Sequence, residues 1–321
     1  MSNSTEEKTG IFTRKKVLVA ILGILLALIV FGGGYGFYLL SKTNKVDINK
    51  DNLEINTELD SKEITNIALY GVDAPQCENG FSNTIMILTI DEKHNKLKLS
   101  SIMKDTYVDV KDHGKTNLAN AYAYGGLELA INTLNSNFDL NIDKFITVNF
   151  HSLPKIIDEL GGVSVNITNG DLEHINRYID GLNESNNTNS SHITQTGIQT
   201  IDGTQAAAYA TIIYDGGDES RTSRQRDILE SLFDKASNIS ISEIPGILDE
   251  FLPLVYTNMS STDLISVGTD IIRMRNSTKE ESLFPNDKNV QQEVVDGIEY
   301  QVIDKDAVTK DIHQFIFEEQ K

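Results

Sequence analysis

The sequence predicts an α/β layered domain that follows a single N-terminal transmembrane helix. Three observations lead to this fold class. Residues 17–40 form an apolar run without a charge, strand and helix patterns alternate after residue 63, and 39% of the 321 residues are hydrophobic, enough to bury a sizeable core. The single cysteine, Cys77, cannot form a disulfide within the chain, so the fold must depend on that core.

The uncharged run over residues 17–40 is long enough to cross a membrane. As a helix it would span roughly 36 Å, whereas the hydrocarbon core of a bilayer is about 30 Å thick. Arg14, Lys15 and Lys16 precede it directly, and the positive-inside rule then places the N-terminus in the cytoplasm. A buried core helix is the alternative, but the run has no polar face. We expect a cytoplasmic tail over 1–16, a single-pass cell-membrane anchor over 17–40, a polar stalk over 41–62 and one extracellular domain over 63–321.

Apolar runs in this domain predict its strands and helices in order. Strands are expected over 66–72, 84–90 and 97–103, and the short polar turn between the last two predicts an antiparallel hairpin. A helix over 125–138, a strand over 145–150, a helix over 152–160 and a strand over 163–167 follow. The low-complexity stretch 183–191 is expected to be a surface loop. Later patterns predict helices over 203–209 and 218–236, a strand over 300–303 and a helix over 307–318.

Polar side chains fall at the ends of the first three predicted strands. If the strands pair in antiparallel order, Asp73, Asn83 and Lys104-Asp105 meet at one end of the sheet. A carboxylate, an amide and an ammonium would then converge where loops can be shaped without disturbing the core. These residues have an alternative interpretation as ordinary polar strand terminators.

A second polar cluster lies over residues 215–226, where two glycines and Asp218 as N-cap predict the start of a helix. Arg221, Arg224 and Gln225 then share one helix face. Arginines near a helix N-terminus suit a phosphate or pyrophosphate ligand. A solvated helix face with local Asp/Arg pairs explains the pattern equally well.

The charge balance excludes some functions. A formal net charge of -19 repels nucleic acid, so we expect no nucleic-acid partner. The six histidines are scattered, without the spacing of a metal site. No nucleophile elbow or phosphate-cradling glycine loop is present in the sequence.

Several motifs in order resemble the LytR-CpsA-Psr family of cell-envelope proteins. The resemblance covers about residues 66–232. The motifs are Asn66-Ile-Ala-Leu-Tyr-Gly-Val-Asp73, Ser100-Ile-Met-Lys-Asp-Thr-Tyr107, Thr116-Asn-Leu-Ala-Asn-Ala-Tyr122, Leu160-Gly-Gly-Val163 and Gly217-Asp-Glu-Ser-Arg-Thr-Ser-Arg-Gln225. They follow the family's order and spacing, behind a short tail and a single anchor as in the family.

The resemblance implies a three-layer α/β/α domain outside the membrane. It also implies transfer of an anionic glycopolymer from a polyprenyl-pyrophosphate carrier to peptidoglycan, with Mg2+ and an apolar tunnel for the lipid. Carried over by motif, Asp73 and Asn83 would hold Mg2+, while Lys104, Arg221, Arg224 and Gln225 would contact the substrate. Asp105 or Asp218 would position these cations or serve as base. Lys104, Asp105 and Asp218 are therefore the catalytic candidates.

This sequence departs from the family pattern at its charged positions. The family's Arg-Ser-Asp reads Phe81-Ser82-Asn83, its Pro-Arg-Asp reads Met103-Lys104-Asp105, and its Tyr-x-Arg-x-Arg reads Tyr209-Ala-Thr211-Ile-Ile213. Each charge-assisted phosphate contact contributes roughly 1.5–3 kcal/mol, so the losses weaken a site that must neutralise phosphate charge. Two hypotheses follow. The chain is a Mg2+-dependent phosphotransferase, with Arg226 or Lys115 as possible substitutes for the missing arginines, or a catalytically degenerate member that binds polyprenyl-linked precursors or regulates envelope assembly. The oligomeric state is not predicted.

Overall fold

The computed structural model describes most of the chain after residue 40. The described residues are 38, 40–59, 61, 63–73, 80–149, 153–212, 224, 227, 228, 231, 249, 252–274, 277–286, 288–295 and 298–317. They fall into two compact units. We call the one described over residues 38–149 and 252–317 the sheet unit, and the one described over residues 153–249 the hairpin unit.

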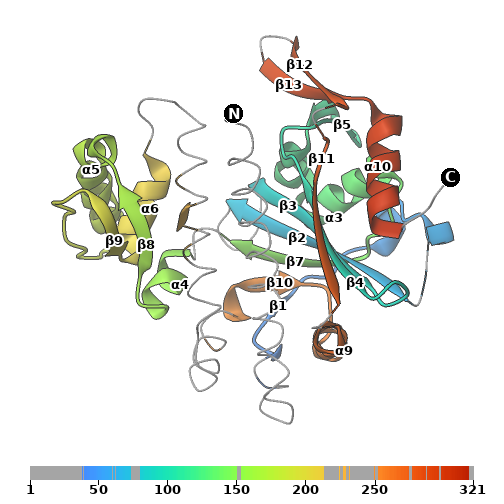
Figure 1. Ribbon diagram of the computed structural model, residues 1–321, viewed down its shortest axis with the longest axis horizontal. Helices are drawn as coiled ribbons and strands as arrows, with labels where there is room; N and C mark the ends of the chain where they lie inside the picture. Colours follow the sequence, from blue (N-terminus) through green and yellow to red (C-terminus); the bar gives the residue numbers. More distant parts are fainter. Residues whose placement is uncertain are drawn as a thin grey trace. The chain divides into compact units, whose positions relative to one another are not determined.

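A seven-stranded mixed sheet forms the centre of the sheet unit (Figure 1). Its strand order is β1 (Asn44–Lys45), β10 (Val255–Thr257), β7 (Lys144–Asn149), β2 (Ile64–Asp73), β3 (Phe81–Asp91), β4 (Lys96–Ile102) and β11 (Thr278–Phe284). β2, β3 and β4 form an antiparallel meander, whereas β7 runs parallel to β2 and β11 parallel to β4. The predicted antiparallel hairpin of β3 and β4 is confirmed, and β2 has the antiparallel direction that would bring the three strand ends together.

Two helices pack against one face of this sheet. Helix α3 (Leu118–Phe138) and helix α10 (Lys305–Phe317) share a hydrophobic cluster with the inward residues of β2 and β3, among them Tyr70 and Ile87. Residues on the opposite face of the same strands, such as Ile67 and Leu88, are also fully buried. The central strands are therefore covered on both faces, which gives the predicted mixed α/β fold.

Three smaller elements complete the sheet unit. β5 (Tyr107–Val110) and β6 (Gly114–Asn117) form a hairpin directly before α3. β12 (Val290–Val295) and β13 (Ile298–Ile303) form a two-stranded ribbon before α10. Helix α9 (Ser261–Arg273) separates β10 from β11 and buries Leu264, Val267 and Ile271.

The segment expected to be a stalk contributes to the folded sheet unit. β1 pairs with β10, and Leu53, between the short 3-10 helices η1 (Lys50–Asn52) and η2 (Thr57–Leu59), is fully buried in the main hydrophobic cluster. Asn135 of α3 donates a 2.9 Å hydrogen bond to the backbone oxygen of Leu53. Residues 44–59 are thus packed against the domain.

The hairpin unit surrounds a small antiparallel pair. β8 (Val163–Ile167) and β9 (Gly197–Ile201) pack with α4 (Leu153–Glu159), α5 (Asn169–Asn186) and α6 (Gly203–Thr211) around a second hydrophobic cluster. α5 and α6 both begin with capping boxes, at Thr168 and Asp202. The predicted loop over 183–191 is partly wrong, because α5 continues to Asn186 before Asn187 adopts a left-handed conformation.

The predicted membrane anchor over 17–40 lies outside the described residues, apart from Tyr38 and Leu40. In the part of the chain that the structure describes, no helix combines the length and the apolar character needed to span a bilayer. The predicted helix over 218–236 also lies almost entirely outside the described residues.

Candidate functional site at one end of the central sheet

The antiparallel meander brings the first group of predicted site residues to one end of the sheet. Asp73 is the last residue of β2 and pairs with Phe81 at the start of β3, and Lys104 and Asp105 follow the end of β4. β7, parallel to β2, ends at the same level, where Asn149 pairs with Val72. Strand ends of this kind are where α/β proteins commonly place ligand sites.

A β-bulge shapes this end of the sheet. Gly71 pairs with Thr84 and Val72 with Ser82, so Asn83 is the extra residue that has no partner across the strands. Asn83 therefore lies within β3, and its side chain is exposed. Ser82, in contrast, is fully buried. The bulge thus leaves an exposed amide side chain near the end of β2, and the oxygen of that amide can serve as a ligand donor.

The Lys104–Asp105 turn is fixed by the N-terminus of α3. The backbone oxygens of Lys104 and Thr106 accept 2.9 Å hydrogen bonds from the backbone N–H groups of Ala119 and Leu118. These two carbonyls satisfy helix donors that would otherwise need a capping side chain. The turn therefore has a defined backbone position, while its two side chains extend into solvent.

The Lys104 and Asp105 side chains form an exposed ion pair. Lys104 Nζ lies 3.4 Å from Asp105 Oδ1, and the side chains are 38% and 47% exposed. Such a pair contributes at most about 1 kcal/mol, so an anionic ligand can recruit the ammonium at little cost. The strand-end site therefore offers one cation and several oxygen donors.

Arg224, predicted to bind phosphate, is buried within the hairpin unit. Its Nη1 lies 3.3 Å from Asp171 Oδ1, the two side chains are 6% and 2% exposed, and Nη2 donates to the backbone oxygen of Ile212. The other Asp171 oxygen accepts hydrogen bonds from the Thr168 backbone N–H and hydroxyl at the start of α5. The geometry gives Arg224 a structural role, because its guanidinium joins the start of α5 to the end of α6.

The other members of that predicted cluster, Asp218, Arg221 and Gln225, lie outside the described residues. Nearby, the Tyr209 hydroxyl donates to Asp227 Oδ2 at 3.1 Å. Burial and the negative charges of Asp227 and Asp171 raise the pKa of Tyr209, so it remains a neutral donor at physiological pH. Thr211, where the family has an arginine, is exposed, and its hydroxyl donates to the Ala207 oxygen of its own helix.

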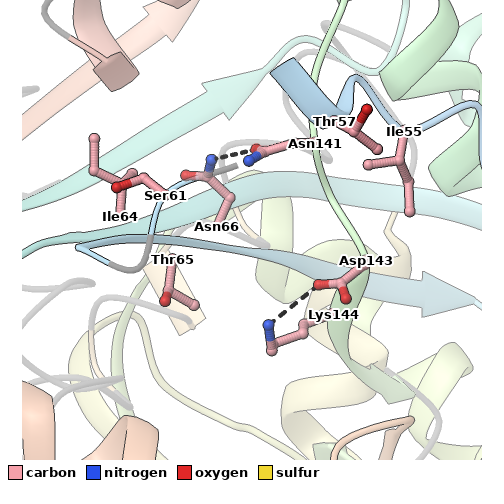
Figure 2. Close-up of a pocket in the computed structure, with 9 residues that line it drawn as sticks. All are labelled: Ile55, Thr57, Ser61, Ile64, Thr65, Asn66, Asn141, Asp143 and Lys144. Carbon is pink, nitrogen blue, oxygen red and sulfur yellow. Dashed lines mark hydrogen bonds and ion pairs between the residues drawn. The ribbon is translucent and has the colours of Figure 1, made fainter. Parts of the chain in front are cut away.

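A cavity of about 530 Å³ lies at the opposite end of the sheet, where β2 and β7 begin (Figure 2). Its amide side chains bond to one another: Asn66 donates to Asn141 Oδ1 at 2.8 Å, and Asn141 donates to the Leu59 oxygen at 3.1 Å. Burial alone would raise the pKa of Asp143, but the nearby Lys50 and Lys144 ammonium groups outweigh burial and lower this pKa. These bonds fasten the 55–61 segment to the sheet, and sequence analysis did not identify this cluster.

A buried charge pair near the β3–β4 turn was also missed. Lys98 Nζ lies 2.7 Å from Asp91 Oδ2 and 3.0 Å from the Ile316 oxygen, and both charged side chains are fully buried. His94 Nδ1 contacts Asp91 as well, at 2.8 Å. Burial alone would raise the pKa of Asp91, but the hydrogen bonds of Lys98 and His94 and the charge of Lys98 outweigh burial, and the net pKa is lowered. Lys98 also complements the C-terminal dipole of α10, so this cluster is structural.

Among the side chains that the structure describes, no group of three or more His, Cys, Asp and Glu residues could hold a metal ion. At the strand-end site, Asp73 and Asn83 would supply one carboxylate and one amide oxygen. That set fits Mg2+, which commonly takes one or two protein oxygens and completes its shell with water and substrate phosphates.

The chain thus has the general form of an α/β protein whose strand ends carry oxygen donors and a lysine, a place where such proteins commonly bind ligands. The chain is a member of the LytR-CpsA-Psr family, since the model of the LytR_cpsA_psr family matches residues 36–315. The resemblance predicted from the motifs is thereby confirmed.

Two relatives match almost the whole chain. The polyisoprenyl-teichoic acid--peptidoglycan teichoic acid transferase TagU of Bacillus mycoides (strain KBAB4) is 30% identical over 313 residues, covering 93% of this chain and 96% of that protein. The TagU of Enterococcus faecalis (strain ATCC 700802 / V583) is 27% identical over 310 residues, covering 92% and 95%. A structure of YwtF (TagT), a Bacillus subtilis protein, with bound octaprenyl pyrophosphate lipid has a TM-score of 0.52, 22% identity and coverage of 82% and 95%. That likeness establishes the shared fold.

Proposed function

We propose that this chain is a membrane-anchored cell-wall protein that attaches an anionic glycopolymer, carried on polyprenyl pyrophosphate, to peptidoglycan. The observation that carries this proposal is the strand-end site, where Asp73, Asn83 and Lys104-Asp105 meet in a chain that matches polyisoprenyl-teichoic acid--peptidoglycan teichoic acid transferases over nearly their full length. The lipid bound to TagT supports a polyprenyl carrier as the ligand class.

The proposed roles follow from the chemistry of the donors. Asp73 and Asn83 would hold Mg2+, which would neutralise charge on the pyrophosphate. Lys104 would contact a phosphate oxygen, and Asp105 would accept the proton of the acceptor hydroxyl as it attacks phosphorus, while polyprenyl phosphate leaves. Asp218, Arg221 and Gln225 remain candidates for further substrate contacts, and Asp218 for positioning or base catalysis.

The location is part of the proposal. An anchor over 17–40 would hold the folded units at the outer face of the cell membrane, where a lipid-linked substrate could enter from the bilayer. A third layer of helices on the second sheet face would complete an α/β/α sandwich and an apolar site for the lipid. The burial of Ile67, Leu69 and Leu88 on that face supports this arrangement.

A specific observation favours a second candidate, a non-catalytic binder of lipid-linked precursors. Arg224 is committed to Asp171 inside the hairpin unit, and exposed Phe81 and Thr211 stand where the family has arginines. Lys104 is therefore the one described cation of the predicted set that remains exposed to solvent. A protein with this pattern could bind a lipid carrier and yet stabilise the transfer transition state poorly.

The two functions can be separated with the full chain in detergent micelles, a polyprenyl-pyrophosphate-linked glycopolymer, peptidoglycan and Mg2+. A transferase should lose turnover on the order of 100-fold with Asp73→Ala and about tenfold with Lys104→Gln. Glu92→Ala, an exposed carboxylate change at the opposite end of the sheet, should leave turnover unchanged. Lipid binding without any transfer would favour the binder, and full transfer by Asp73→Ala would contradict the proposed metal site.

A further inference from the structure

Two tyrosines lie in contact on the outer side of the sheet unit. The ring centroids of Tyr107 on β5 and Tyr300 on β13 are 4.5 Å apart, with planes tilted by 44°. Both residues are only partly buried. Val108 and Val110 point into the main hydrophobic cluster, so Tyr107, which alternates with them along β5, projects away from it. An aromatic pair is thus held at the surface.

This pair lies beside the Lys104–Asp105 turn. The Gln301 backbone N–H donates to the Asp105 oxygen at 3.3 Å, and Gln301 and Thr106 form an isolated parallel bridge. Tyr300 is the residue directly before Gln301, and Tyr107 directly follows Thr106. In Figure 1 the β12–β13 ribbon extends beyond β5 at this point. The position of the ribbon therefore links the aromatic pair to the strand-end site.

Asn117 places an amide next to the rings. It pairs with Tyr107 across the β5–β6 hairpin, and opposed residues in an antiparallel pair project from the same face. Asn117 is also the N-cap of α3, but its side chain makes no capping hydrogen bond. Within the described part of the chain, its buried Oδ1 has no hydrogen-bond partner. The amide oxygen therefore makes no hydrogen bond to the described part of the fold.

We propose that Tyr107, Tyr300 and Asn117 form a platform for the glycan backbone of the peptidoglycan acceptor. The flat ring surfaces suit the C–H face of a pyranose, and the amino group of the Asn117 carboxamide, on a partly buried residue, can donate a hydrogen bond to a sugar hydroxyl or acetamido oxygen. All three side chains are neutral in a chain of net charge -19, which suits an uncharged sugar better than the anionic polymer. The proposal rests on the proposed function and places its acceptor beside Asp105.

The platform can be tested by binding, without the lipid donor. The probe is a neutral tetrasaccharide of N-acetylglucosamine, a sugar of the peptidoglycan backbone, titrated against the full chain in detergent micelles by calorimetry. Tyr300→Leu and Tyr107→Leu keep apolar volume but remove the ring, and each should weaken binding about three- to tenfold. Asn117→Ala should weaken binding by a similar factor, with little change in α3 stability because no capping bond is lost.

Tyr124→Leu is the matched control, because Tyr124 is 47% exposed and stacks on His113 elsewhere on the sheet unit. It should bind the glycan like the parent chain. Tyr300→Phe should retain binding, since it keeps the ring. If the parent fails to bind the tetrasaccharide, or if the Tyr107 and Tyr300 variants bind it normally, the platform is refuted. Glycan binding by a chain that performs no transfer would refute the transferase while leaving the platform intact.

Discussion

Replacing Arg224 by leucine should destabilise the hairpin unit without removing a phosphate contact. The change leaves the Asp171 carboxylate, which is 2% exposed, without the guanidinium 3.3 Å away, and it also removes the hydrogen bond to the Ile212 oxygen. Loss of one partner from a buried ion pair typically costs about 3–5 kcal/mol. Because Asp171 keeps its bonds to Thr168, we expect about 3 kcal/mol, the lower end of that range.

Urea unfolding of the full chain, followed by amide hydrogen exchange in α5 and β8, measures this loss where it should occur. A second change, Asp171→Asn, should recover part of the lost free energy, since the uncompensated charge is then gone. Arg177→Leu, at an exposed position of α5, is the matched control and should change stability by less than about 0.5 kcal/mol.

The same variants separate a structural arginine from a ligand-binding one. At a temperature where Arg224→Leu remains folded, its affinity for a polyprenyl pyrophosphate should equal that of the parent chain. If Arg224→Leu unfolds like the parent chain but loses lipid affinity, the structural role is refuted and Arg224 is a substrate-binding residue.

Two further changes test the interior of the fold. Lys98→Met should lower the unfolding free energy by about 3 kcal/mol, because it leaves the Asp91 carboxylate buried with only His94 beside it. The pKa of Asp91 is lowered in the folded state, so the pair stabilises the parent chain fully above the unfolded pKa near 3.8. This stabilisation is lost as the pH falls through the lower pKa of the folded state. An acid-unfolding profile that Lys98→Met leaves unchanged would contradict the stabilising role of the pair. Gly126→Ala should lower the melting temperature, since φ +61° and ψ −153° is a region that only glycine adopts easily, at a cost of about 1–3 kcal/mol for alanine. Gly181→Ala, at a position inside α5 with open space around it, should raise the melting temperature. Equal effects of Gly126→Ala and Gly181→Ala would disprove the backbone strain at the α3 kink.

Strands with alternating or continuous apolar patterns could be predicted from the sequence. β2, β3, β4, β7 and β8 were all expected within a few residues, because their side chains meet the core directly. β11 was not expected. It reads Thr-Lys-Glu-Glu-Ser-Leu-Phe, and such charges are tolerated because β11 is an edge strand. α3 was expected to begin at Gly125, but that glycine lies at an internal kink, seven residues after the helix starts at Leu118.

Part of the candidate site could likewise be predicted from the sequence, and part of it could not. The meeting of Asn83 and Lys104 followed from the short turn between β3 and β4, which favours antiparallel pairing, whereas Asp73 joins them because β2 also runs antiparallel to β3, which the sequence had left open. The bulge at Asn83 could not be predicted, because it depends on a shift of register that the sequence does not mark. The pairing of Arg224 could not be predicted for a different reason: helical spacing showed which residues share its face, but its partner Asp171 lies 53 positions away in the chain.

The charges that remain at the strand-end site limit how the chain can handle a pyrophosphate. Lys98 and Arg224, both cations in an acidic chain, are used inside the two units to pair with Asp91 and Asp171. Lys104 has an exposed carboxylate beside it, so its net attraction for phosphate is modest. Neutralisation would then fall mainly on a metal that arrives with, or is completed by, the phosphates themselves. Such a site can hold a lipid-linked precursor while it depends on a neutral surface, beside Asp105, to orient the acceptor.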